Sequence, residues 1–246
     1  MKACEVIVQE RTKQLEDCKR ELLEKLQDAI DLQTRIGKTD EETYFQEYVR
    51  VTRDEGVGDQ DATAIALNLL KEAGVEGSLS STSNKRIDHR KADKEKAKGK
   101  GKDLSSDLKD KIWELREQTH DIRKLTKELV GRVRSLRYFT VVRDLQRQVD
   151  EAPTIACPSC GNDAVEVEDI AVLSSCGHTG CLKCVTSYAE REECVHAKSG
   201  NCRAAARVLN VVKGSTLGVD DVARDGNGRH FGLKLEKVVD LIRCVV

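Results

Sequence analysis

The sequence has 246 residues, enough for one or two domains. Only 39% of the residues are hydrophobic and 3% aromatic, whereas 35% are charged; this is too little apolar material for one large globular core and favours long solvated helices with a small compact module. The net charge of -1 hides local asymmetry, so charge has to be read by segment. No apolar run approaches membrane-spanning length and the N-terminus lacks a secretory hydrophobic region, so we expect an intracellular protein.

Apolar residues at helical spacing predict two long helices. The first covers residues 5–36 and ends near Gly37. The second covers 104–152, where apolar residues recur every three or four positions up to Pro153. A helix that is apolar along one stripe needs a partner. We expect the two helices to pair as an antiparallel coiled coil within one chain, with a homodimer as the alternative arrangement.

Two shorter helices are predicted between the long ones. Thr39 followed by Glu42 is a capping signature and marks a possible helix start. Residues 61–73 predict a further helix, with Asp61 as its cap and Gly74 as its stop.

Residues 77–103 differ in composition from the rest. They combine a Ser-rich stretch with a basic low-complexity run, and so few apolar groups predict a disordered linker. The predicted division of the chain is therefore an N-terminal helical segment (1–76), the linker (77–103), the long coiled-coil helix (104–152), a cysteine-rich module (153–212) and a tail with a short amphipathic helix (213–246).

Seven of the ten cysteines fall between residues 157 and 202. Zinc favours four thiolate or imidazole ligands in a tetrahedron, and C-x2-C is a short spacing that puts two thiolates on one ion. Eight ligands make two complete sites with no position left for water, so the zinc would be structural. The candidate ligands are Cys157, Cys160, Cys176, His178, Cys181, Cys184, Cys194 and Cys202.

Redox and disulfide interpretations of the same cysteines fit less well. The CPSC motif lacks the strand-to-helix context of a thioredoxin site, and a redox pair leaves six ligands unexplained. Disulfides require an oxidising compartment, which nothing in the sequence indicates.

The ligand order resembles that of a RING finger of the type with three cysteines, one histidine and four cysteines, over residues 157 to about 203. The resemblance implies a small α+β domain with interleaved sites. Cys157, Cys160, Cys181 and Cys184 would share one zinc, and Cys176, His178, Cys194 and Cys202 the other. RING fingers usually close with C-x2-C, whereas seven residues separate the last pair here, so His196 is an alternative to Cys194 as the seventh ligand.

The resemblance further implies a ubiquitin ligase that docks a ubiquitin-conjugating enzyme with its ubiquitin and supplies no catalytic residue of its own. Of four positions typical of the docking surface, two match: Tyr188 on the helix after the sixth ligand and Arg203 directly after the last ligand. Ser159 stands where an aliphatic residue is common, and Val195 where proline is common.

The coiled coil entering the RING, together with residues 232–241, is similar to the RING-bearing segment of Swi/Snf-type ATPases, but no motor lobe is present. The GKT sequence at 37–39 is a poor phosphate-binding loop because Leu32 replaces its first glycine, so we reject ATP binding for this chain.

Three functions follow from these patterns. The leading one is a zinc-binding RING-type ubiquitin ligase, with the substrate and the cognate conjugating enzyme open. The second is a zinc-stabilised interaction scaffold without ligase activity, and the third a DNA-associated accessory or a fragment of a nuclear Swi/Snf-type ATPase. Basic residues within 85–102 and 123–147 support DNA contact and nuclear targeting, although a solvated coiled-coil face accounts for the same charges.

Overall fold

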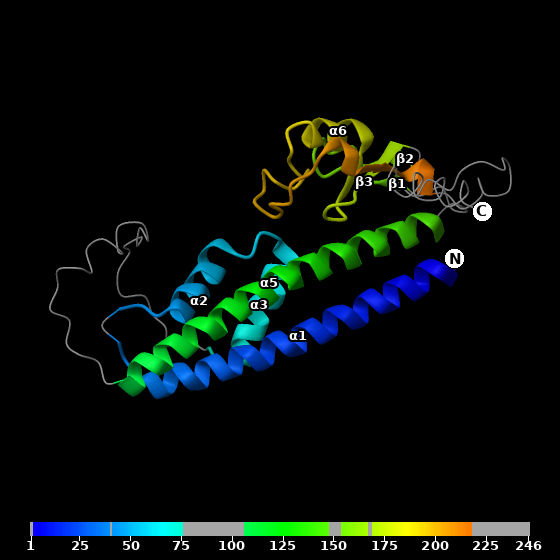
Figure 1. The fold of residues 1–246 in the computed structure, drawn as a ribbon. Coiled ribbons are helices and arrows are strands. Elements are labelled where there is room, and N and C mark those ends of the chain that lie inside the picture. The colour runs from blue at the N-terminus through cyan, green and yellow to red at the C-terminus, as the bar shows by residue number, and fades with distance from the viewer. Residues whose placement is uncertain (1, 40, 76–105, 148–153, 167–168, 218–246) are drawn as a thin grey trace, which may run out of the picture. The chain divides into compact units, whose positions relative to one another are not determined.

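A computed structural model describes residues 2–39, 41–75, 106–147, 154–166 and 169–217 (Figure 1). The chain forms two compact units, each treated separately below. We call residues 15–130 the helical unit, and residues 1–14 with 131–246 the terminal unit. Helices α1 (Lys2–Ile36) and α5 (Ser106–Arg147) contribute to both. The predicted linker at 77–103 and the predicted helix at 232–241 lie outside the described residues.

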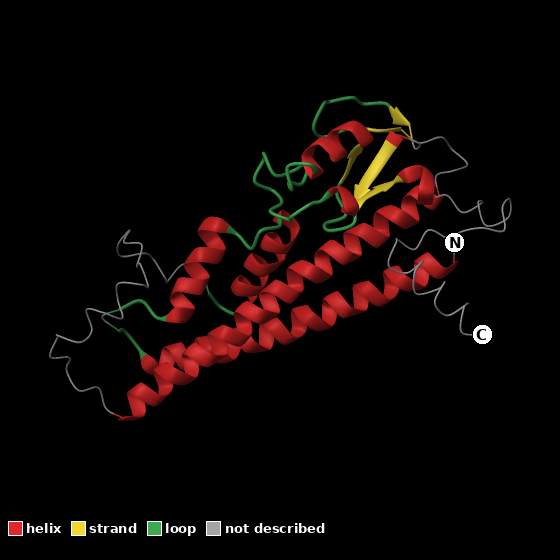
Figure 2. Cartoon of the chain, turned by 45° about the horizontal axis from the view of Figure 1, so that its top comes forward, coloured by secondary structure: helices red, strands yellow, loops and turns green. Residues whose placement is uncertain are grey.

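The helical unit packs α1 and α5 together with two shorter helices, α2 (Tyr44–Glu55) and α3 (Gln60–Glu72). In this unit the two long helices lie side by side in both Figure 1 and Figure 2. The Cys18 Sγ lies 3.9 Å from the Leu125 carbonyl oxygen. Fully buried side chains fill the interior, among them Leu22, Leu26, Phe45, Val49, Leu70, Leu115, Ile122 and Leu129. None of the described helices is both long and apolar enough to span a membrane.

The pairing of the long helices is antiparallel and occurs within one chain, as predicted. In the helical unit Cys18 contacts Leu125. In the terminal unit Arg132 donates a hydrogen bond of 2.7 Å to the Oε1 of Gln14. Partner numbers on α5 therefore fall as those on α1 rise, which is the sequence relation of an antiparallel pair.

Two threonines belong to the buried stripe of α5, although the apolar pattern did not include them. Thr119 and Thr126 are almost fully buried, and each hydroxyl donates to the carbonyl four residues earlier, at 2.7 Å and 2.8 Å. The Thr126 oxygen also shares a hydrogen bond of 2.8 Å with the hydroxyl of Tyr48 on α2. Because every hydroxyl has a partner, these groups are buried without the cost of an unsatisfied donor.

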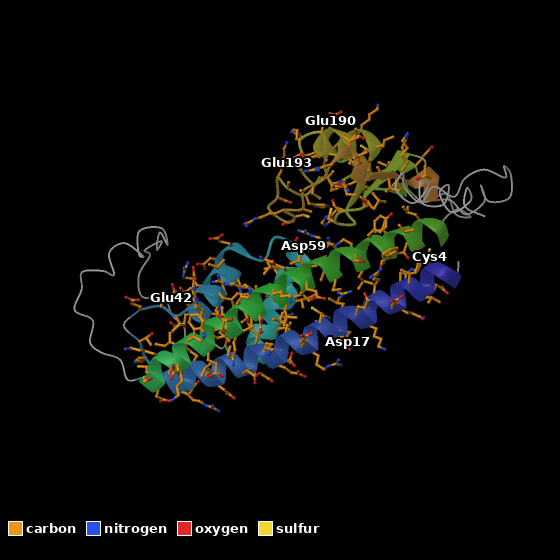
Figure 3. All side chains as sticks on the ribbon, viewed as in Figure 1. Cys4, Asp17, Glu42, Asp59, Glu190 and Glu193 are labelled. Carbon is orange, nitrogen blue, oxygen red and sulfur yellow. The ribbon has the colours of Figure 1, made fainter. Side chains whose placement is uncertain are left out.

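The caps of the short helices differ from those predicted. Helix α2 begins after Thr43, whose side chain and that of Gln46 form a reciprocal capping box; the Thr39 hydroxyl instead donates to a carbonyl two residues further on. Helix α3 is capped by Asp59 (Figure 3), not by Asp61, which lies in its first turn. A cap residue needs an extended backbone and an acceptor facing the third amide, and Thr43 and Asp59 meet both conditions.

The terminal unit contains a small α+β domain. Strand β3 (Ile170–Leu173) lies between β4 (Thr179–Cys181) and β5 (Val211–Lys213), and both neighbours are antiparallel to it. Helix α6 (Leu182–Ala189) packs on this sheet, and β1 (Thr154–Ile155) pairs with β2 (Val165–Glu166). Two 3-10 turns, η3 (Val208–Asn210) and η4 (Gly214–Leu217), flank β5. The predicted fold class, a mostly helical region followed by a small α+β domain, is confirmed.

Strand β3 divides the interior of this domain into two cores. All four of its residues are buried, and successive side chains of a strand point to opposite faces. Ile170 and Val172 pack in one cluster with Leu145, Cys157 and Val165. Ala171 and Leu173 pack in the other, which contains Cys176, Val185, Tyr188, Ala189, Cys194, Val195, Cys202, Ala204 and Ala206.

The hydrogen bond between Tyr48 and Thr126 offers a test of the helical unit. Tyr48→Phe removes a buried hydroxyl, so we expect a loss of about 1 kcal/mol in the free energy of unfolding. Tyr44→Phe on the same helix is the matched control, because Tyr44 is exposed and should change the stability little. The single tryptophan, Trp113, lies in this unit and reports its unfolding in urea by fluorescence. Equal losses in the two variants would contradict the assignment.

Candidate metal centre

The first cluster of ligand atoms is built from Cys157, Cys160, Cys181 and Cys184. The first pair belongs to the turn after β1, and the second joins the end of β4 to the first turn of α6. All four sulfur atoms lie within 4.8 Å of one another. This cluster ties together segments that are more than twenty residues apart in the chain.

The second cluster consists of Cys176, His178, Cys194 and Cys202, and its ligand atoms also lie within 4.8 Å of one another. Its first pair forms the turn between β3 and β4, and its second pair comes from the loops after α6. The three cysteines are buried, whereas in the first cluster Cys160 is exposed. The two groups interleave along the chain as the family resemblance implied.

The spacing of the ligand atoms suits zinc. A tetrahedron with zinc–sulfur bonds of about 2.3 Å places its sulfur atoms roughly 3.8 Å apart. The Sγ atoms of Cys160 and Cys181 are 3.9 Å apart, and those of Cys176 and Cys194 are 3.6 Å apart. The Cys194 Sγ lies 3.4 Å from the Nδ1 of His178. The first donor set is four thiolates and the second is three thiolates with one imidazole, and zinc prefers both, so the predicted cofactor, two structural zinc ions, is confirmed.

In the first cluster, hydrogen bonds from backbone amides favour the thiolate form of one cysteine. Burial alone would raise the pKa of the Cys157 thiol, but hydrogen bonds from backbone N–H groups, including that of Cys181 at 3.4 Å, lower this pKa to about 6. Burial raises the pKa of Cys184 to about 12. One thiolate is therefore favoured by the fold itself, and a divalent cation supplies the charge that deprotonates the others.

In the second cluster, too, neighbouring thiols and an imidazole shift one another's pKa. Burial opposes protonation of His178, but its hydrogen bonds with Cys176 and Cys202 raise the pKa of this imidazole to about 9. Hydrogen bonds with neighbouring thiols raise the pKa of Cys194 and lower that of Cys202. A metal ion removes this competition because it replaces the shared protons with one central charge.

Successive tight turns accommodate the long spacing between Cys194 and Cys202. The amide of Ala197 donates to the Cys194 carbonyl at 2.8 Å, and that of Gly200 donates to Ala197 at 3.0 Å. The chain therefore coils back on itself and returns Cys202 to the cluster. His196 is not in the four-atom group; its ring centre lies 4.5 Å from that of His178.

The turn carrying Cys176 and His178 also contacts helix α5. The Nη1 of Arg137 donates a hydrogen bond of 2.8 Å to the Cys176 carbonyl. Gly177 adopts a left-handed backbone (φ +75°), and a Cβ at this position would lie 2.5 Å from the backbone nitrogen of Tyr138. Glycine thus allows the metal-binding turn to rest directly on the helix backbone, a contact that the sequence pattern did not reveal.

The residues predicted to bind a partner have different surroundings. Ser159 and Arg203 are exposed. Tyr188, on α6, is only 6% exposed and belongs to the core cluster around the second metal site. Its interaction with the Ser159 side chain, followed by that with Lys198, lowers the pKa of Tyr188. Val195 is buried in the same cluster.

Several basic residues of α5 have partners within their own unit. In the helical unit Arg123 pairs with Glu47 at 3.0 Å. In the terminal unit Arg143 pairs with Asp144 at 2.7 Å. Arg132 and Arg137 bind the side chain of Gln14 and the Cys176 carbonyl respectively. These contacts show that part of the basic stretch at 123–147 serves intramolecular packing.

The described fold and both clusters define a small zinc-binding α+β domain that follows a helical region. No family model matches the sequence. A similar protein is the DNA (cytosine-5-)-methyltransferase DMT5 of the fungus Cryptococcus neoformans var. grubii, which is 37% identical over 255 residues. The match covers 99% of this chain but 10% of that relative, so the chain corresponds to about a tenth of the relative's length.

The contact at Gly177 predicts unequal effects of two glycine substitutions. Gly177→Ala should destabilise the terminal unit by about 3 kcal/mol, because the left-handed backbone and the clash with Tyr138 both add cost. Gly161 also has a positive φ (+69°) but no atom near a Cβ, so Gly161→Ala should cost only about 1 kcal/mol. Zinc release during urea unfolding, followed with a chromogenic chelator, measures both values. Similar midpoints for the two variants would show that the helix contact contributes nothing.

The identity of the seventh ligand predicts zinc content. Cys194→Ala should reduce the content from two zinc ions per chain to about one, because three ligands hold zinc less tightly than four. His196→Ala should keep both ions. Elemental analysis of dialysed protein gives the stoichiometry, and the opposite pattern would assign the position to His196.

Proposed function

We propose that the zinc-binding domain is a RING-type module that recruits a ubiquitin-conjugating enzyme for transfer of ubiquitin to a protein substrate. The observation that supports this proposal is the pair of four-ligand clusters, whose ligand pairs alternate along the chain. Ser159 lies between the first two ligands of one site, and Tyr188 lies on the helix that starts at the ligands of that same site. These are two of the positions that the family resemblance assigns to partner docking.

The proposed mechanism is positioning. Both metal sites have four protein ligands, so zinc supplies structure and no open position for a reacting group. The domain would hold the conjugating enzyme and its bound ubiquitin in a reactive orientation, which lowers the entropic part of the barrier. In this scheme the exposed Arg203, directly after the last ligand, orients ubiquitin against the enzyme.

A second candidate is an interaction module without ligase activity inside a larger protein that acts on DNA. The relative is named as a DNA methyltransferase, and the burial of Tyr188 removes most of one expected docking side chain from the surface. In this case the domain would join parts of a nuclear assembly, such as a Swi/Snf-type ATPase, and DNA contact would involve the exposed Lys124 and Lys127 of α5. Homodimerisation would be a further property of this candidate.

A ubiquitination assay distinguishes the candidates. The purified chain is incubated with ubiquitin, activating enzyme, ATP and a panel of conjugating enzymes, and we expect ubiquitin chains with at least one member. Arg203→Ala should lower the rate about tenfold or more, because an interaction that positions the reacting groups is lost. Arg207→Ala is the matched control: Arg207 is a nearby exposed arginine, paired with Glu192 at 3.4 Å, and should leave the rate unchanged.

If no conjugating enzyme forms ubiquitin chains while the protein still binds two zinc ions, the ligase is excluded and the interaction module is favoured. Equal rates for the wild type and Arg203→Ala would remove Arg203 from the mechanism.

A further inference from the structure

Two cations converge on Tyr188 at the surface of the zinc-binding domain. The guanidinium carbon of Arg191 lies 4.5 Å from the centre of the Tyr188 ring, and the Nζ of Lys198 lies 5.7 Å from the same centre. Arg191 follows α6, and Lys198 belongs to the loop between Cys194 and Cys202. With Ser159 beside the tyrosine, we call Ser159, Tyr188, Arg191 and Lys198 the cationic patch.

The metal sites hold the parts of this patch in place. Ser159 lies between two ligands of the first site, and Lys198 lies between two ligands of the second. The Tyr188 ring is fixed in position because it is buried in the core cluster. The patch is therefore a pre-formed arrangement, and a partner would not have to bear the entropy of assembling it.

The two charges are available to a partner. Arg191 and Lys198 are exposed, and neither forms an ion pair with any residue in the described part of the chain. By contrast, the nearby Arg207 is paired with Glu192. The contacts of Arg191 are the tyrosine ring and the Ser187 carbonyl, at 3.3 Å from its Nε. Stacking on the ring orders the cations without neutralising them.

We propose that the cationic patch binds an acidic side chain of a protein partner, with the carboxylate held between Arg191 and Lys198. This inference rests on the proposed function in one respect: if the domain recruits a conjugating enzyme, the patch selects enzymes with a carboxylate at the contact. An aliphatic residue at position 159 would offer apolar contact there, whereas the Ser159 hydroxyl suits a polar partner.

The surrounding charges favour a single carboxylate over a polyanion. Glu190 directly precedes Arg191 and Glu193 follows it by two residues, and both glutamates are exposed (Figure 3). Their negative charges would repel a nucleic acid backbone, which presents a phosphate every few ångströms. A folded partner can present one acidic group to the cations and keep the rest of its surface away from the glutamates.

Binding of two probes by the full chain tests the inference. The first probe is a rhodamine-labelled peptide with one glutamate among neutral residues, measured by anisotropy at low ionic strength, and the second is the panel of conjugating enzymes. The double variant Arg191→Glu with Lys198→Glu should weaken peptide binding at least about tenfold, and raising the ionic strength to about 0.5 M should abolish it. Lys213→Glu, an exposed charge reversal on β5, is the control and should have little effect.

Zinc content verifies that each variant is folded. If the reversal releases zinc, the neutral pair Arg191→Gln with Lys198→Gln replaces it, with an expected weakening of about threefold. The inference would be overturned if both double variants bound the peptide as tightly as the wild type or as Lys213→Glu does. Duplex DNA that binds more tightly than the peptide, and depends on the same two residues, would also overturn it.

The outcomes for the inference and for the ligase are separable. Patch-dependent binding of the single-glutamate peptide with no conjugating enzyme bound would support the inference and contradict the ligase. Ubiquitin transfer that is unchanged by the reversed patch, together with peptide binding that is also unchanged, would support the ligase and overturn the inference.

Discussion

Metal coordination is the interaction on which the small α+β domain depends. Each site joins two pairs of ligands that are separated in the chain, and the pairs of one site alternate with those of the other. With β3 as the only four-residue strand described, the sheet by itself would bury too little apolar surface to offset chain entropy. Structural zinc contributes on the order of 10 kcal/mol in such domains, which accounts for order in so small a core.

The long helices and the metal ligands could be predicted because both follow from local rules. Apolar residues at steps of three and four define a helix face, and cysteines in C-x2-C pairs define a metal-binding turn. The same rules explain the omissions. Thr119 and Thr126 are polar by type and so fell outside the apolar stripe, although the helix backbone satisfies their hydroxyls. The prediction placed the caps at Thr39 and Asp61 instead of Thr43 and Asp59, because several residues near each helix start have a suitable side chain.

Contacts between distant segments left no pattern in the sequence. The requirement for glycine at position 177 comes from the backbone of α5, some forty residues earlier, and nothing beside Gly177 in the chain indicates it. The convergence of Arg191 and Lys198 on one ring depends likewise on the path of the loop between Cys194 and Cys202. Spacing alone could not decide between Cys194 and His196, since both lie within reach of the turn, and only the spatial grouping separates them.

The alternation of β3 limits how the domain can change in length. Because its odd and even residues belong to different cores, inserting or deleting a single residue in β3 would exchange the two sets and disrupt both metal sites together. The loop between Cys194 and Cys202 has no such restriction, since its ends are fixed by a metal and its middle is exposed. Length variation in related proteins should therefore concentrate in that loop, where a new side chain can be brought to the surface beside α6 without altering the framework that holds it.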